Sequence, residues 1–154
     1  MKLSHHLTLQ EATKSATAIR KGIYNLPVDE HLAALVNTAN KIFEPIRNHF
    51  NVPIGISSGY RSNALNNAIS GSSKTSQHSK GEALDIDADI YGSITNKQIF
   101  DFVKDNLEFD QLIWEFGTDN EPNWVHVSIK HFGEQRKQIL RASRVRGKVN
   151  YSNY

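Results

Sequence analysis

The chain has 154 residues, of which 38% are hydrophobic and 22% charged, and its formal charge of +2 is close to balanced. These values are typical of a single domain over residues 1–154, and they give no case for a nucleic-acid partner. Cysteine is absent. Disulfides, cysteine nucleophiles and thiolate metal sites are therefore excluded, and any metal site must use histidine and carboxylate ligands.

Helical signals dominate the first third of the chain. Thr8 and Glu11 fit a capping box at the start of a first helix. Asp29 is a suitable N-cap for the longest helix, whose apolar side chains recur every three or four residues over 32–50. Pro45 conflicts with that pattern because it lacks a backbone donor, so we expect a kink or a break there.

Short strands follow. The sequence predicts strands over 54–58, 83–88, 110–116 and 124–130, the last two joined as a hairpin, and a polar loop over 70–81. Helices are expected from Ser62 to near Ile69 and from Thr95, which forms a second capping box with Gln98. Residues 138–145 are predicted as a strand or an extended tail. Early helices and late strands favour an α+β fold, with a small antiparallel sheet and helices packed on one side.

Three side chains in the second half of the chain are candidate metal ligands. His78 ends the polar loop and Asp85 lies on the next strand, so a bend can bring imidazole and carboxylate together. His126 lies between two valines on a later strand, where its ring nitrogens need a polar partner. Each signal alone is also consistent with a solvated or hydrogen-bonded side chain. Asp87, on the same strand face as Asp85, is the alternative carboxylate.

A hydrolytic metal site also needs a general base and a group that binds substrate. Glu115 lies in an apolar strand, where an ionisable group is costly unless it is paired or used. We expect Glu115 opposite His126 across the hairpin, with Cβ atoms roughly 4.5–5.5 Å apart. Glu121, in the hairpin loop and expected to be solvated, is the rival, followed by Asp119. Arg61 follows a strand at a turn and is suited to hold a carboxylate or an oxyanion.

Several short motifs, taken in order, resemble one family. They are Ser58-Gly59-Tyr60-Arg61-Ser62, Leu65-Asn66, Ser76-Gln77-His78, Gly81-Glu82-Ala83-Leu84-Asp85-Ile86 and Trp124-Val125-His126-Val127-Ser128. This set, over roughly residues 7–130, is similar to the zinc D-Ala-D-Ala carboxypeptidase family, which includes phage endolysins and is related to the hedgehog zinc fold. The resemblance implies one Zn²⁺ ion whose ligands are His78, Asp85 and His126. Arg61 matches the substrate-side arginine of the family, and we expect a substrate contact from Tyr60 as well. Ser76 and Gln77 offer hydrogen bonds to the substrate or to the residues that support the metal ligands.

One position departs from the family pattern. Several members carry the catalytic acid three residues before the last metal ligand, where this chain has Asn123, which cannot accept a proton. The hedgehog domain instead has a glutamate at the end of the preceding strand, and the run from Phe109 to Glu115 is similar to that pattern. We therefore predict Glu115 as the general base, with Glu121 as the alternative.

The resemblance implies a zinc metallopeptidase that hydrolyses peptidoglycan stem peptides in the manner of a D-Ala-D-Ala carboxypeptidase. Two alternatives stay open: an endolysin-type L-alanyl-D-glutamate endopeptidase and a non-catalytic zinc-binding recognition domain. No run approaches the roughly 20 apolar residues of a membrane span, and the chain starts without the apolar segment of a secretory signal. We expect a monomer that has no membrane partner. It would stay in the cytoplasm until release, as a phage lysis enzyme does, unless a leader has been trimmed, and would act at the cell wall.

Overall fold

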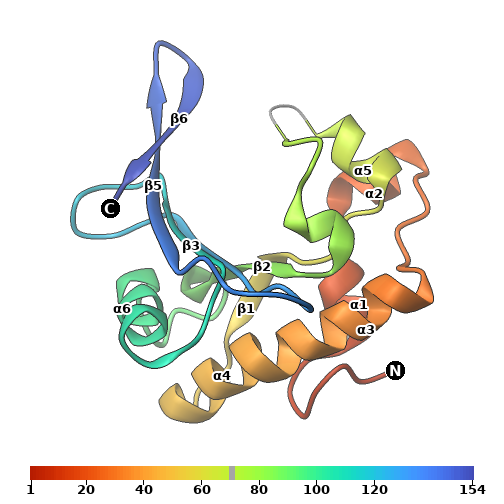
Figure 1. Cartoon of the computed structure of the whole chain (residues 1–154), viewed down its shortest axis with the longest axis horizontal. Helices are drawn as coiled ribbons and strands as arrows, with labels where there is room; N and C mark the ends of the chain where they lie inside the picture. Colours follow the sequence, from red (N-terminus) through yellow and green to blue (C-terminus); the bar gives the residue numbers. More distant parts are fainter. Residues whose placement is uncertain (70–71) are drawn as a thin grey trace.

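One six-stranded sheet organises the computed structural model, which describes residues 1–69 and 72–154 (Figure 1). The strands are β1 (Gly55–Ser58), β2 (Ala83–Asp87), β3 (Gln111–Glu115), β4 (Trp124–Ser128), β5 (Gln138–Val145) and β6 (Lys148–Asn153). Their order is β1-β2-β4-β3-β5-β6, and neighbours are antiparallel except β3 and β5, which are parallel. The α+β class is confirmed. The segment over 138–145 is a strand, and the parallel pair was not predicted.

Two of the helices begin with the capping boxes that the sequence predicts. The helices are α1 (Leu9–Thr13), α2 (Ala16–Lys21), α3 (Asp29–Thr38), α4 (Glu44–Phe50), α5 (Asn63–Ala68) and α6 (Asn96–Asn106), with a π-helix η1 (Ala39–Phe43) and 3-10 turns η2 (Gln77–Lys80) and η3 (Ala88–Ile90). Thr8 caps α1 and Thr95 caps α6, each with the expected partner at the third helical position. Val28, not Asp29, is the N-cap of α3, and Asp29 lies in the first turn, where a negative charge is favourable. Of the predicted loop over 70–81, residues 70–71 lie outside the described residues and 77–80 form η2.

Pro45 does not break the long helix. The residues that join α3, η1 and α4, namely Thr38, Ala39, Phe43 and Glu44, all have right-handed helical backbone angles. The chain widens to a π-helical turn just before Pro45, which then takes a first-turn position of α4. A first-turn residue needs no intrahelical N–H donor, so the helix continues across the proline.

The sheet separates the apolar core from a polar face. Alternate residues of the central strands are buried against α3, η1, α4 and α6; they are Leu84, Ile86, Leu112, Trp114, Val125 and Val127. In Figure 1, α4 and α6 lie below the central strands, whereas α5 and the β5–β6 hairpin rise above them. Because side chains alternate along a strand, Asp85, Glu115 and His126 project to the face away from this core.

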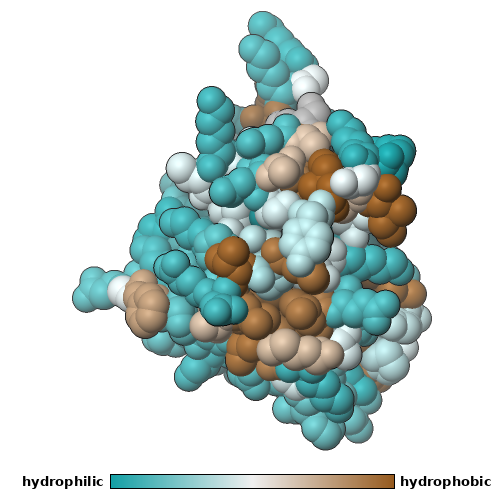
Figure 2. Space-filling view, turned by 90° about the vertical axis from the view of Figure 1, so that its right-hand side faces the viewer, coloured by the Kyte–Doolittle hydropathy of each residue, from teal (hydrophilic) through white to brown (hydrophobic). Residues whose placement is uncertain are grey.

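Some apolar surface stays exposed near the N-terminal helices. Figure 2 shows brown apolar side chains scattered among hydrophilic ones on the side of the molecule that faces right in Figure 1. The exposed large apolar residues of α2 and the segment leading to α3 are Ile19, Tyr24, Leu26 and Val28. Within residues 1–69 and 72–154, no helix combines the length and apolar character that a membrane span requires.

Candidate metal centre and active site

Three buried side chains from distant parts of the chain meet on the polar face of the sheet. His78 comes from η2, and Asp85 of β2 pairs directly with His126 of β4. His126 Nδ1 lies 2.9 Å from Asp85 Oδ1, and His78 Nε2 lies 3.3 Å from both of these atoms. The three residues are only 3%, 6% and 9% exposed. The structure thus brings the three predicted ligands together.

This triangle of polar atoms fits a divalent metal ion. Ligand distances of about 2.0–2.1 Å in tetrahedral geometry place two ligand atoms about 3.3 Å apart. The measured edges of 2.9 and 3.3 Å are close to that spacing. His78 Nδ1 lies 2.7 Å from the Gly59 carbonyl oxygen, so its N–H donates there and Nε2 turns a lone pair towards Asp85. A cation relieves the repulsion between that lone pair and the carboxylate.

The charge states of the triangle suit metal binding. Burial lowers the pKa of His78, which keeps the ring neutral and able to act as a ligand. Burial opposes ionisation of Asp85, but its hydrogen bond with His126 Nδ1 outweighs this effect and holds the pKa of Asp85 well below the usual range. Asp87, the alternative carboxylate, instead accepts hydrogen bonds from the Asp89 N–H at 3.0 Å and from Asn96 Nδ2 at 3.2 Å.

Local structure holds η2 in place. Ser76 caps this turn, because its hydroxyl accepts a hydrogen bond from the His78 N–H at 3.3 Å. Gly81 ends it with a left-handed φ of 76°, and a Cβ atom there would lie 2.2 Å from the His31 carbonyl oxygen on α3. Only glycine allows this close approach. The predicted substrate contact Ser76 therefore has an identified role in positioning His78, and its contact with substrate stays a prediction.

Asp110 ties the segment that bears His78 to the sheet. Its carboxylate is fully buried and accepts hydrogen bonds from Gln77 Nε2 at 3.0 Å and from the Arg136 N–H at 2.9 Å. Lys130 Nζ lies 3.3 Å away. Burial opposes ionisation, but the contacts with Arg136 and Lys130 outweigh it and hold the pKa of Asp110 well below its usual range. Gln77 thus uses its amide in a network that supports the segment of His78, and its partner Asp110 was not predicted; a contact of Gln77 with substrate stays a prediction.

Asp110→Asn is expected to lower the free energy of unfolding by about 1.5–3 kcal/mol at neutral pH, because the charged acceptor of several hydrogen bonds is lost. The pKa of Asp110 is lower in the folded protein than in the unfolded chain. Its contribution is therefore complete above a pH of about 4 and is lost as the pH falls towards the folded pKa. Urea unfolding at pH 7 and pH 3 tests this. Asp119→Asn is the control, because its carboxylate is 91% exposed; a deficit undiminished at pH 3 would contradict the prediction.

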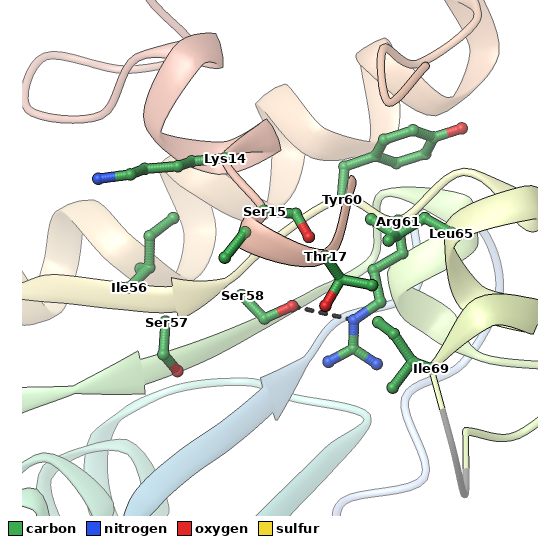
Figure 3. A pocket seen from close by; sticks show the side chains of 11 residues that line it. Lys14, Ser15, Thr17, Ile56, Ser57, Ser58, Tyr60, Arg61, Leu65 and Ile69 are labelled. Atoms are coloured by element: carbon green, nitrogen blue, oxygen red, sulfur yellow. Dashed lines mark hydrogen bonds between the residues drawn. The ribbon is translucent and has the colours of Figure 1, made fainter. Parts of the chain in front are cut away.

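Arg61 connects the metal triangle to a pocket. Its Nε donates to Ser58 Oγ at 2.9 Å, and one terminal nitrogen donates to Asp85 Oδ2 at 3.0 Å. The guanidinium therefore orients a predicted metal ligand, a contact that sequence reasoning did not identify. Figure 3 shows the same group in a pocket of about 480 Å³ between α2, β1 and α5. The pocket also contains the Lys14 side chain and the hydroxyls of Ser15 and Thr17.

Tyr60 lies mainly in the core. Its ring is 5% exposed, and its hydroxyl lies 3.2 Å from His31 Nδ1. In Figure 3 the ring points away from the Arg61 guanidinium, although the residue forms part of the pocket wall. The predicted contact of Tyr60 with substrate stays a prediction, and its visible role is to anchor the backbone that carries Arg61.

Arg61→Lys is expected to lower kcat/KM by roughly 10–100-fold with little change in melting temperature. Lysine keeps the charge but cannot reach Ser58, Asp85 and a substrate oxygen at once, as the planar fork can. Steady-state kinetics, zinc content and thermal unfolding of the variant measure the three effects. Arg20→Lys, on the exposed surface of α2, is the matched control. A large loss of stability with normal activity would show that Arg61 serves the fold.

Glu115 lies at the end of β3, beside the triangle. The register pairs Glu115 with Trp124 and places Ile113 opposite His126. The predicted direct pairing of Glu115 with His126 is therefore wrong by two residues. An even shift preserves the face, so the two side chains are diagonal neighbours, about 7–8 Å apart between Cα atoms.

The environment of Glu115 suits proton transfer. The residue is 7% exposed, and burial raises the pKa of its carboxyl to about 7; the charge of Asp85 adds to this rise, whereas His126 and Arg61 oppose it. Among the described residues, no side-chain or backbone donor is hydrogen-bonded to this carboxylate. A carboxyl with a pKa near neutrality and no competing donor is able to exchange a proton with water at neutral pH.

The alternative acids are engaged elsewhere. Glu121 is partly exposed, as expected of a loop residue, but its Oε1 also accepts hydrogen bonds from the Asn96 and Lys97 N–H groups at 2.6 and 3.2 Å, at the start of α6. Asp119 forms an ion pair with Arg141 at 2.7 Å. Glu115 is thus the acidic side chain of the hairpin that the structure places beside the triangle.

Two imidazoles, a carboxylate and an adjacent buried glutamic acid have the chemistry that a hydrolytic metal site requires. A family model described as peptidase M15 matches residues 5–128, which include every residue of this site. The chain therefore belongs to the peptidase M15 family, whose members are metal-dependent peptidases. No curated protein matches the chain.

Proposed function

We propose that the protein is a zinc metallopeptidase that cleaves stem peptides of bacterial peptidoglycan, in the manner of a D-Ala-D-Ala carboxypeptidase. The buried triangle of His78, Asp85 and His126 beside Glu115 is the observation that carries the proposal. Two imidazoles and one carboxylate form a ligand set that suits Zn²⁺, and catalytic zinc sites use three protein ligands and keep one position open. Membership of the M15 family supports peptide hydrolysis.

Each residue of the site has a defined task in this mechanism. A zinc ion held by the triangle would act as a Lewis acid, which lowers the pKa of a water molecule and polarises a carbonyl group. Glu115 takes a proton from the attacking water and delivers it to the leaving amine, for which a pKa near 7 is well matched. Arg61 holds Asp85 in position, and its remaining N–H groups hold a carboxylate of the peptide or stabilise the developing oxyanion.

The charge beside the triangle favours an anionic peptide. Arg61 and Lys14 both line the pocket next to the metal site. A terminal carboxylate, such as that of D-Ala-D-Ala, is a suitable partner for the Arg61 guanidinium, whereas the Lys14 side chain points away from that group in Figure 3. An endopeptidase that cleaves L-alanyl-D-glutamate would use the same guanidinium for a carboxylate of the glutamate residue. Glu115 is buried, and no hydrogen-bond donor among the described residues holds its carboxylate, so it is free to exchange a proton as a hydrolase requires.

Digestion of purified peptidoglycan, followed by mass spectrometry of the fragments, tests the proposal. Loss of the terminal D-Ala from pentapeptide stems is the expected result. A new N-terminal D-glutamate would instead assign the endopeptidase activity. A zinc-loaded protein that releases no fragment would overturn the catalytic function. Chelator-treated protein, before and after zinc is restored, is the control that links hydrolysis to the metal.

A further inference from the structure

The C-terminal hairpin adds a wall beside the metal triangle. The family match ends at residue 128, whereas β5 and β6 lie beyond it. β5 pairs with β3, the strand that carries Glu115, and β6 pairs with β5. In Figure 1 this hairpin rises above the central strands, as α5 does on the other side of the view. One face of this hairpin continues the polar face of the sheet, where the candidate site lies, as the strand register shows below.

The register places one aromatic residue of β6 in line with Glu115. Glu115 pairs with Ala142, and Ala142 pairs with Tyr151. Directly paired residues project to the same face, so Tyr151 shares the face of the metal triangle. Two strand spacings separate Tyr151 from Glu115, about 10 Å between their backbones. The residue between them has only a methyl side chain, which leaves room for the phenol ring to lean towards Glu115.

The surroundings of Tyr151 agree with this placement. Burial raises the pKa of its phenol, the charges of Glu115 and Asp85 raise it further, and Arg61 acts in the opposite direction. The charges that act on this phenol are thus those of the candidate site. Yet the residue is 54% exposed, and among the described residues its hydroxyl has no hydrogen-bond partner. A hydroxyl that is half exposed and bonds to no described residue is available to a ligand.

We propose that Tyr151 is a substrate-contacting residue that faces Arg61 across the metal triangle. Its hydroxyl donates a hydrogen bond to a carbonyl or carboxylate oxygen of the bound peptide, and its ring covers the peptide backbone. The inference rests on the proposed peptidase function and extends it to a strand outside the family match. A tyrosine with one free polar group and an apolar ring suits a peptide, which presents both kinds of surface.

Kinetics on a soluble muropeptide test the hydrogen bond. Tyr151→Phe removes one oxygen and is expected to raise KM by roughly two- to tenfold with kcat little changed, because the lost contact binds substrate and transition state alike. Tyr151→Ala also loses the ring and should raise KM further. Tyr91→Phe is the matched control, since Tyr91 is 57% exposed and lies after η3. An unchanged KM in both Tyr151 variants, with normal wild-type turnover, would overturn the proposal.

A second measurement separates this inference from the proposed function. In protein labelled with 3-fluorotyrosine, the ¹⁹F resonance of Tyr151 is assigned by its loss in Tyr151→Phe. Addition of paramagnetic Co²⁺ should broaden that resonance and leave the one from Tyr91 sharp. If wild-type protein cleaves no muropeptide, the peptidase proposal fails, while broadening still places Tyr151 at the metal site. A Tyr151 resonance that stays sharp with Co²⁺ bound would refute the placement itself.

Discussion

Glu115→Gln is expected to lower turnover of stem peptides by roughly 10²–10⁴-fold while zinc stays bound. Glutamine preserves the volume and hydrogen-bonding shape of the side chain but cannot accept the proton from water. The carboxylate is not one of the three converging ligand groups, so metal content should be unchanged. Measurements of kcat on muropeptides and metal analysis of the same preparation test both parts.

Glu121→Gln is the matched control for this variant. Glu121 contacts the start of α6, so its loss should reduce stability modestly and leave turnover nearly normal. If Glu121→Gln were the inactive variant and Glu115→Gln were active, the general base would lie in the hairpin loop. If both variants were active, Asp119 would be the next residue to test.

Glu115→Gln should also stabilise the metal-free protein. Burial raises the pKa of Glu115 from 4.5 to about 7 in the folded state, so folding becomes less favourable as the pH rises between these values. Above pH 7 the full penalty applies, and removing it should raise the free energy of unfolding by about 3 kcal/mol. Below the unfolded pKa the gain should vanish. Urea unfolding with a chelator at pH 8 and pH 4 measures both; equal stability at pH 8 would contradict the burial argument.

His126→Ala is expected to lose most of the bound zinc. The wild-type protein should bind about one equivalent per chain, because one triangle of ligands is present among the described residues. Loss of a direct ligand should weaken binding by more than the roughly 100-fold that altering an outer partner costs. Equilibrium dialysis with a competing chelator measures the affinity.

Asp87→Asn is the control for the identity of the ligands. Asp87 bonds to Asn96 and to the turn after β2, so this variant should keep its zinc. Unchanged zinc content in His126→Ala would refute the assigned triangle, and loss of zinc in Asp87→Asn would move the carboxylate ligand to Asp87.

Local rules in the sequence predicted two helix starts and the faces of residues on two central strands. Thr8 and Thr95 cap their helices because a capping box involves neighbouring residues alone. Strand alternation, which has a period of two, correctly separated the buried Val125 and Val127 from His126, and Asp85 from the buried Leu84 and Ile86. The absence of cysteine restricted the candidate metal ligands to histidine and carboxylate residues.

Only the tertiary structure decided the register of the paired strands and the contacts of the site residues. The turn after β3, with Phe116 and Gly117 at left-handed φ angles of 55° and 73°, sets Glu115 opposite Trp124 and not His126. Gly117 is required there, since a Cβ atom would lie 2.1 Å from the Glu121 carbonyl oxygen. No residue spacing encodes such a turn, because its backbone angles depend on contacts across the loop.

Long-range contacts were equally inaccessible. Arg61 meets Asp85 across 24 residues of chain, and Gln77 meets Asp110 across 33. Tyr151 lies in register with Glu115 because β3 pairs in parallel with β5, and β5 pairs with β6. Side-chain chemistry along the sequence determined which residues were able to bind metal or move a proton. Their distances, burial and partners follow from the packing of segments that are remote in sequence, and only the folded chain fixes these.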